Sequence, residues 1–247
     1  MIGPRPAGSA ADPLRLDGVS FAMLFVALAL LASLPVLACE TLPLFDYPNY
    51  LARMHILSAL PNSESLQRYY EVSWHALPNL AMDLTVPQLA RWLPLAWAGK
   101  VFVISTLCLL AGGAAVLHRV LFSSWSAWPL LAFLLLYSRT FLWGLLNYLS
   151  GVGLSFFALA LWIALANRPL IRMAAGTALA LCLFFAHLLA CGLYGILVMG
   201  YEAGVIIRKR PPVARALGAL ILAGAPFLPA IAIFLLLTPA RGRSYRL

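Results

Sequence analysis

Apolar residues in this chain gather into long runs separated by short polar breaks. A helix needs about 20 predominantly apolar residues to cross the hydrocarbon core of a bilayer, so runs of this length predict membrane-spanning helices. The pattern predicts an all-α polytopic membrane protein with about seven transmembrane helices. They fall at residues 19–38, 101–117, 125–137 and 145–166, twice within 173–207, and at 214–237.

Three of these runs have a feature beyond their apolar length. Residues 173–207 form about 35 apolar residues, too many for one crossing at about 1.5 Å per residue, and His187 near the middle predicts a turn between two helices. Pro226 and Pro229 interrupt the last run, since proline removes a backbone donor. The first run has a cleaved signal peptide as its competing interpretation, but it is long for one, and we favour a retained anchor.

Residues 39–97 are polar enough to leave the membrane but carry too many aromatic residues for a linker. One helix is predicted at 47–60, opened by Asp46 at its N-cap and by a proline in its first turn. A second is predicted at 86–98, where Pro87 lies in the first turn and a tryptophan-bearing apolar face suits the membrane interface. We expect this long, partly helical first outer loop to be a small folded unit that rests on the bilayer.

The composition supports a membrane protein. Hydrophobic residues make up 63% of the chain and charged residues 10%, and the mean hydropathy is +0.93, values far from those of a soluble domain. The net charge of +9 comes from lysines and arginines dispersed at the ends of apolar runs. That placement indicates control of membrane topology and excludes a phosphate-binding stripe for nucleic acid.

The short loops predict the orientation, because positively charged loops stay in the cytoplasm. A cytoplasmic N-terminus makes residues 1–18 a flexible cytoplasmic tail ahead of one membrane domain, residues 19–247. It places these residues on the cytoplasmic side: Arg119, Arg168, Arg172, Arg208, Lys209, Arg210 and Arg215. The basic stub 241–247 then lies outside, against the rule, so either the last span is re-entrant or the chain is the N-terminal portion of a longer protein, and we favour the second.

The outer face collects the candidate chemistry, and Asp46 is the sharpest candidate. A carboxylate just beyond a span can serve as a general base toward a hydroxyl, whereas the alternative role is to cap the helix that it begins. Asn49 and Arg53 follow it on the predicted helix and could share a face near it. An arginine there suits a phosphate, with a lipid-headgroup contact or a surface ion pair as the alternative.

Four further polar residues are candidates on the same face. Asp83, together with Asp46, could hold a divalent cation, although no spacing is diagnostic of a metal site. Arg139 and Asn147 interrupt apolar runs, and polar groups at membrane depth tend to face a protein interior or a watery cavity. His187 is a substrate-binding candidate with a structural hydrogen-bonding role as its alternative. The small residues Gly151, Gly153 and Ser155 indicate close helix packing.

Motifs of soluble enzymes are absent from the sequence. It contains no Walker motif, GxSxG, HExxH or CxxC, which argues against an ATP-driven pump or an embedded soluble-type hydrolase.

One string carries a family resemblance. Phe45-Asp46-Tyr47-Pro48-Asn49, with Leu51-Ala52-Arg53 behind it, is similar to the Asp-centred motif that many bacterial members of the GT-C superfamily of integral-membrane glycosyltransferases carry at this place. The layout resembles that superfamily too: a charge-free first span, a long first outer loop with interface helices, and then closely spaced helices. Residues 143–148 and 151–154 are similar to segments of uncharacterised bacterial multipass proteins of the same kind.

The resemblance implies a transferase of the bacterial inner membrane that opens to the periplasm. It would move a sugar from a polyprenyl-phosphate donor to a glycan, lipid or protein acceptor, with Asp46 in the position of the catalytic base and Asp83 as the second acidic match. The chain lacks the further spans and outer domain of many members. The alternative is a non-catalytic membrane component or a transporter of envelope polysaccharide or lipid; the absence of internal repeats argues against the transporter.

Overall fold

The computed structural model describes residues 14–237, so the predicted tail before residue 14 and the stub 241–247 lie outside the described residues. Within 14–237 the regular secondary structure is helical apart from one pair of two-residue strands. Six stretches are long and apolar enough to cross a membrane, which confirms a polytopic helical membrane protein. They are α1 (Gly18–Ala38), α5 (Leu95–Phe122), α8 (Leu146–Ala164), α9 (Pro169–Ala186), α10 (Leu188–Lys209), and α11 (Val213–Gly224) with α12 (Leu228–Leu236).

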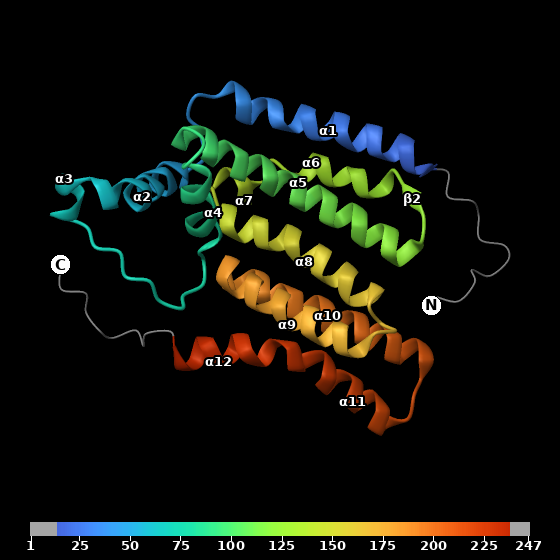
Figure 1. Ribbon diagram of the computed structural model, residues 1–247. Helices are drawn as coiled ribbons and strands as arrows, with labels where there is room; N and C mark the ends of the chain where they lie inside the picture. Colours follow the sequence, from blue (N-terminus) through green and yellow to red (C-terminus); the bar gives the residue numbers. More distant parts are fainter. Residues whose placement is uncertain (1–13, 238–247) are drawn as a thin grey trace.

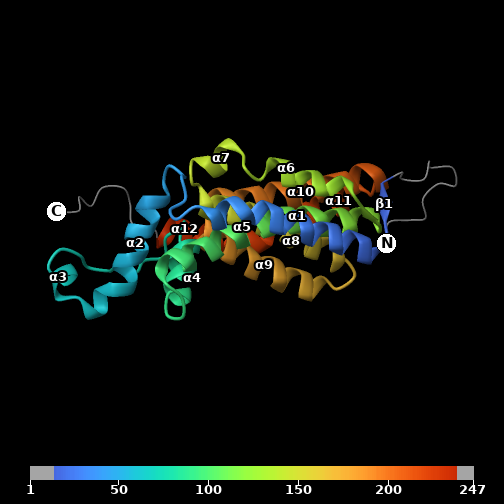
Figure 2. The same ribbon diagram turned by 90° about the horizontal axis from the view of Figure 1, so that it is seen from above.

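These helices lie side by side and form a bundle with two different ends; α5, α8 and α10 run in one direction, and α1, α9 and α11–α12 in the other (Figure 1). At the loop end, α1 stops, α5 begins, and the short helices of the first loop project beyond the bundle (Figure 2). At the opposite end, here called the basic end, α5, α8 and α10 stop while α9 and α11 begin. The basic residues predicted to share one membrane side lie in or next to these helix ends.

The N-terminal segment is more ordered than the sequence predicted. Residues Arg15–Leu16 form strand β1, which pairs antiparallel with β2 (Trp125–Ser126). Asp17 then caps α1, since its Oδ1 accepts hydrogen bonds from the backbone N–H groups of Val19 and Ser20 at 2.9 and 3.0 Å. Residues 14–18, predicted as part of a flexible tail, are therefore structured, and strand pairing with a distant segment explains why local composition missed it.

The predicted third span, 125–137, is not one continuous helix. After β2 come the 3₁₀ turn η2 (Trp128–Leu131), α6 (Ala132–Leu135) and α7 (Arg139–Leu142). This segment nevertheless leads from the basic end, where β2 pairs with β1, to the loop end, where the carbonyl of Leu142 accepts a hydrogen bond from the N–H of Phe45 at 3.0 Å. It thus makes a further, broken pass along the bundle, anchored by the Tyr137 hydroxyl donating to the Ala32 carbonyl of α1 at 2.5 Å.

The first loop contains α2 (Tyr47–Ala59), the turn η1 (Leu60–Asn62), α3 (Glu64–Gln67) and α4 (Ala81–Leu89). The first predicted loop helix, 47–60, is confirmed. The second, 86–98, is wrong, because its first residues end α4 and its last ones begin α5. Pro94 stands in extended conformation at the N-cap of α5, so the helix starts after it.

Helix α8 runs through the centre of the bundle, and small residues let its neighbours approach. A Cβ added to Gly153 would lie 2.6 Å from the backbone carbon of Leu109 on α5, and one added to Gly151 would lie 2.4 Å from the Cβ of Ala190 on α10. The Ser155 hydroxyl donates to the carbonyl of Gly151 at 2.8 Å. The predicted packing role of these residues is confirmed, and α8 becomes a rigid support for the groups at its first turn.

The predicted breaks near the C-terminus are also confirmed. His187 is the single extended residue between α9 and α10. The turn η3 (Ala225–Phe227) divides α11 from α12 at Pro226.

Candidate functional site

Two segments meet at the loop end, residues 45–46 before α2 and residues 142–144 at the end of α7. The N–H groups of Phe45 and Asp46 donate to the carbonyls of Leu142 and Trp143, at 3.0 and 3.2 Å. Gly144 follows in the left-handed region with φ +82°, and a Cβ there would lie 3.1 Å from both the Cβ and the backbone nitrogen of Asp46. Because only glycine tolerates this conformation and this approach readily, the turn after α7 holds the backbone of Asp46 firmly in place.

The Asp46 side chain is held far less than its backbone. It occupies the N-cap position of α2 but makes no capping hydrogen bond, so the predicted capping role is wrong. The one hydrogen bond to its carboxylate within residues 14–237 comes from the amide of Asn49, at 3.3 Å. The predicted proximity of Asp46 and Asn49 is confirmed. A half-exposed carboxylate on a fixed backbone, with one long hydrogen bond, is available to accept a proton from another group.

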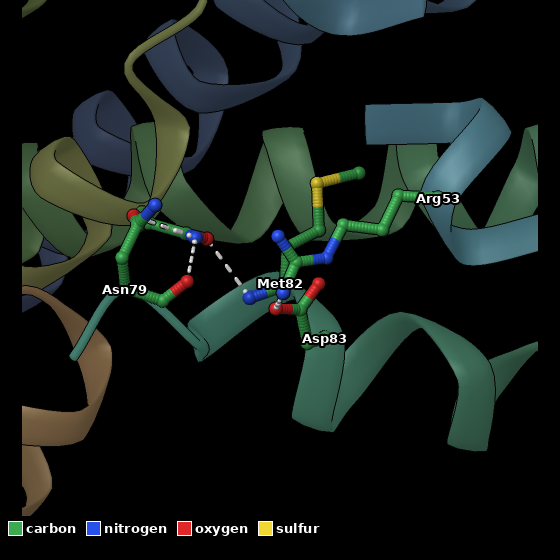
Figure 3. A network of polar contacts seen from close by, with 5 residues as sticks. Arg53, Asn79, Met82 and Asp83 are labelled. Carbon is green, nitrogen blue, oxygen red and sulfur yellow. Dashed lines mark hydrogen bonds and ion pairs between the residues drawn. The ribbon is translucent and has the colours of Figure 1, made fainter. Parts of the chain in front are cut away.

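Arg53, one helical turn beyond Asn49, pairs with Asp83 of α4 (Figure 3). Its Nη2 lies 2.6 Å from Asp83 Oδ2, and the Asp83 side chain is 2% exposed against 56% for that of Arg53. Asp83 Oδ1 is buried without a hydrogen-bond partner among the described residues. Burial raises the pKa of Asp83, and the nearby Arg53 charge opposes that rise. The open side of the Arg53 guanidinium remains accessible to an anion.

Asn147, in the first turn of α8, fixes α4 in place. It is 1% exposed, and its Oδ1 accepts a hydrogen bond from the backbone N–H of Met82 at 2.8 Å. Its Nδ2 donates to the carbonyl and the side-chain oxygen of Asn79, at 2.9 and 3.0 Å. Asn79 has a left-handed backbone with φ 74°. Figure 3 shows Asn79 and Met82 on the two sides of this network, beside the Arg53–Asp83 pair. The predicted inward-facing role of Asn147 is thus a structural one that positions Asp83.

Tyr50 is a site residue that sequence reasoning missed. Burial raises the pKa of its phenol most, the charge of Asp46 raises it further, and a hydrogen bond with the Asn79 side chain opposes the rise. Asp83 and Arg53 also act on it, so the phenol lies within electrostatic reach of both carboxylates. The signal was available, since Tyr50 stands four residues after Asp46 and three before Arg53 on one helix.

Arg139 and His187 lie at the same end but in different surroundings. The Arg139 guanidinium lies 5.1 Å from the ring centre of Trp143, the residue whose carbonyl accepts from Asp46. His187 Nδ1 accepts from the N–H of Leu189 at 3.2 Å, and its ring meets that of Tyr148 edge-on at 5.4 Å. Burial lowers the pKa of His187. The contacts of His187 are those of a helix cap, which matches the structural alternative.

The structure offers no ligand set for the divalent cation that the sequence suggested. Within residues 14–237, no group of three or more histidine, cysteine, aspartate or glutamate side chains lies close enough to hold a metal ion. The cation that faces Asp83 is the guanidinium of Arg53. A metal bridging Asp46 and Asp83 therefore has no support from the described geometry.

Two apolar hollows border the site on its membrane-facing sides. One, of about 670 Å³, lies between α10 and α12 and is lined at its loop end by Tyr148 and Leu188. The other, of about 620 Å³, lies between α4 and α5 and includes Leu89, Trp92 and Phe102. Either has the volume and the apolar lining to accept hydrocarbon.

Comparisons with known proteins add no relative. No protein-family model, no curated protein and no solved structure matches this chain.

Proposed function

We propose that this protein is a membrane glycosyltransferase that moves a sugar from a polyprenyl-phosphate donor to a hydroxyl of a cell-envelope acceptor, with Asp46 as the general base. The observation that carries the proposal is the contrast at Asp46. Its backbone is fixed by two hydrogen bonds to the segment at the end of α7, while its carboxylate neither caps α2 nor joins an ion pair within residues 14–237. A structural aspartate would make such contacts, whereas a base has to be positioned and still available.

In this reaction Asp46 and the nearby arginines have different roles. Asp46 removes the proton of the acceptor hydroxyl as that oxygen attacks the anomeric carbon. The new carbon–oxygen bond forms while the bond from that carbon to the phosphate oxygen breaks, and the electron pair leaves with the polyprenyl phosphate. The leaving group gains negative charge, which the exposed side of Arg53 or the guanidinium of Arg139 is suited to stabilise.

The remaining parts of the proposal concern placement in the membrane. The donor's hydrocarbon chain lies in the hollow lined by Tyr148 and Leu188, so that its phosphate reaches the loop end. The broken pass of residues 125–145 counts as a seventh crossing beside the six long ones. The loop end faces the periplasm and the basic end the cytoplasm of a bacterial inner membrane, because positively charged loops are retained inside.

The test is transfer of radiolabelled sugar from polyprenyl-phosphate donors in membranes that contain the protein, comparing wild type with Asp46→Asn. Loss of a general base costs about 10²-fold or more in rate, so we expect transfer to fall by at least that factor. Glu64→Gln, which removes an exposed carboxylate of the same loop, serves as the matched control and should transfer normally.

Two results would contradict the proposal. Normal transfer by Asp46→Asn would remove Asp46 from the base position. No transfer by the wild type from any polyprenyl-phosphate donor, with both proteins inserted and folded, would make the chain a non-catalytic envelope component, the alternative that the sequence left open.

A further inference from the structure

A polar hollow lies at the basic end. This is the end of the bundle away from the first-loop helices (Figure 1). The volume of the hollow is about 440 Å³, and it is formed where α5, α8 and α10 stop and α9 begins. Its polar lining comprises Ser123, Asn167, Arg172, Tyr201, Arg208 and Lys209, together with Glu202. The proposed transfer reaction uses none of these residues.

Arg172 is locked into the wall of this hollow by three contacts. Its Nη2 pairs with Glu202 Oε1 at 2.5 Å, and its Nε donates to the Trp162 carbonyl at 2.8 Å. Its guanidinium lies 3.9 Å from the ring centre of Trp162, whose indole N–H also donates to Glu202 Oε1, at 2.9 Å. Nη1 makes no hydrogen bond to the described residues. A guanidinium held in this way loses little conformational entropy when it binds an anion.

The charges of the lining favour an anion. Glu202 is the one carboxylate among the lining residues, and Arg172 already neutralises it. Arg208 and Lys209 have no acidic partner within residues 14–237. The carboxyl ends of three helices add partial negative charge, about half a charge each, and this offsets part of the positive charge without reversing it. Hydroxyl and amide donors from Ser123, Tyr201 and Asn167 complete a lining rich in donors.

A purely topological role explains only part of this arrangement. Keeping the basic end in the cytoplasm requires lysines and arginines near the membrane surface, and exposed Arg168 and Arg210 would satisfy it equally. It requires neither a hollow nor an arginine fixed against a tryptophan and a glutamate. These two features are those of a binding site.

We propose that this hollow binds a phosphate group, with Arg172, Arg208 and Lys209 as its ligands. Arginine is suited to bidentate contact with phosphate oxygens, and lysine adds a point charge. A hollow of about 440 Å³ admits the phosphate together with a glycerol-sized or sugar-sized substituent. Two sources share this chemistry: the headgroup of an anionic phospholipid at the membrane surface, and a small soluble phosphate.

The experiment measures binding to the full chain in detergent. Native mass spectrometry with added phosphatidylglycerol or phosphatidylcholine measures how much lipid is bound. Titration calorimetry with inorganic phosphate measures the binding of a soluble phosphate. The variant Arg208→Gln/Lys209→Gln changes two exposed lining residues and leaves the Arg172 network intact. Arg168→Gln/Arg210→Gln removes the same charge from exposed positions outside the hollow.

We expect the lining variant to bind about tenfold more weakly and the control variant to stay within about threefold of wild type. Saturable binding of phosphatidylglycerol in preference to phosphatidylcholine identifies a lipid headgroup as the source, and saturable binding of inorganic phosphate identifies a soluble one. Equal loss in both variants would show general attraction to a basic surface and overturn the proposal. Absence of saturable binding in both arms would overturn it as well. Either result leaves the test of Asp46 unaffected.

Discussion

The ion pair joins the buried carboxylate of Asp83 to the half-exposed guanidinium of Arg53. Removing Arg53 should therefore cost more stability than removing Asp83. Arg53→Gln leaves the Asp83 carboxylate, whose side chain is 2% exposed, without a counter-charge. Asp83→Asn leaves an arginine whose side chain is 56% exposed and can be solvated. Breaking a fully buried pair by removing one partner costs about 3–5 kcal/mol.

Solvent around Arg53 screens the attraction, so the cost of Arg53→Gln is smaller than for a fully buried pair. We expect it to lower the free energy of opening α4 from the bundle by about 1–2 kcal/mol, and Asp83→Asn to lower it by less than about 1 kcal/mol. The double variant should lie closer to Asp83→Asn than to Arg53→Gln, because it has no charge left buried.

Hydrogen–deuterium exchange of the α4 peptide in lipid nanodiscs measures this opening. A loss of about 1–2 kcal/mol speeds the exchange about 5–30-fold. Peptides of α11, which packs against α10 and η3 and not against the first-loop helices, provide the internal control. Equal acceleration by the two single variants, or a double variant as fast as Arg53→Gln, would refute the asymmetry.

The pH dependence gives an independent check. Burial raises the pKa of Asp83 in the folded protein. A carboxyl with a raised pKa stabilises the fold while protonated; this contribution is complete below the pKa of the unfolded chain and is lost as the pH rises through the folded pKa. Removing Arg53 raises the pKa further. The excess exchange of Arg53→Gln, corrected for intrinsic rates, should therefore be largest at neutral pH and shrink as the pH is lowered toward the unfolded value.

Two glycine substitutions test the supports of the site. Gly144→Ala places a Cβ at φ +82° and 3.1 Å from the backbone nitrogen of Asp46, so we expect the Phe45 and Asp46 amides to exchange at least about tenfold faster; unchanged protection would contradict the backbone clamp. Gly153→Ala places a Cβ 2.6 Å from backbone of α5 and should cost about 1–3 kcal/mol, seen as a lower unfolding temperature in detergent. Gly200→Ala, with nothing within 4 Å, is the control and should unfold no earlier than wild type.

Most of the helical framework could be predicted from the sequence, because a crossing of a bilayer is encoded by consecutive apolar residues. The turn at His187 and the bend at Pro226 followed from the same local information. Three fold predictions were wrong. The flexible tail at 14–18 and the continuous span at 125–137 failed because β1 pairs with β2, which lies far away in the sequence. The helix at 86–98 failed because α5 begins only after Pro94.

The candidate site was predictable as a set of residues but not as an arrangement. The Asp46–Asn49 contact spans three residues of one helix and follows from helical geometry. The Arg53–Asp83 pair spans 30 residues and the Asn147–Asn79 contact 68, so both depend on how the loop folds back onto α8. No local pattern fixes such contacts, which is why the sequence singled out Arg53, Asp83 and Asn147 separately and assigned them other partners.

As the proposed seventh crossing, the broken pass of residues 125–145 sets a requirement on how the chain enters the membrane during synthesis. Because α6 and α7 have four residues each, most of their backbone groups need partners outside these helices, and hydrocarbon offers none. The segment is therefore a poor substrate for the insertion machinery by itself. The Tyr137 hydroxyl bonds to α1, and η2 and α6 pack on α5. Because α1 and α5 are both synthesised earlier, these two helices form the surface on which the segment can leave the translocon.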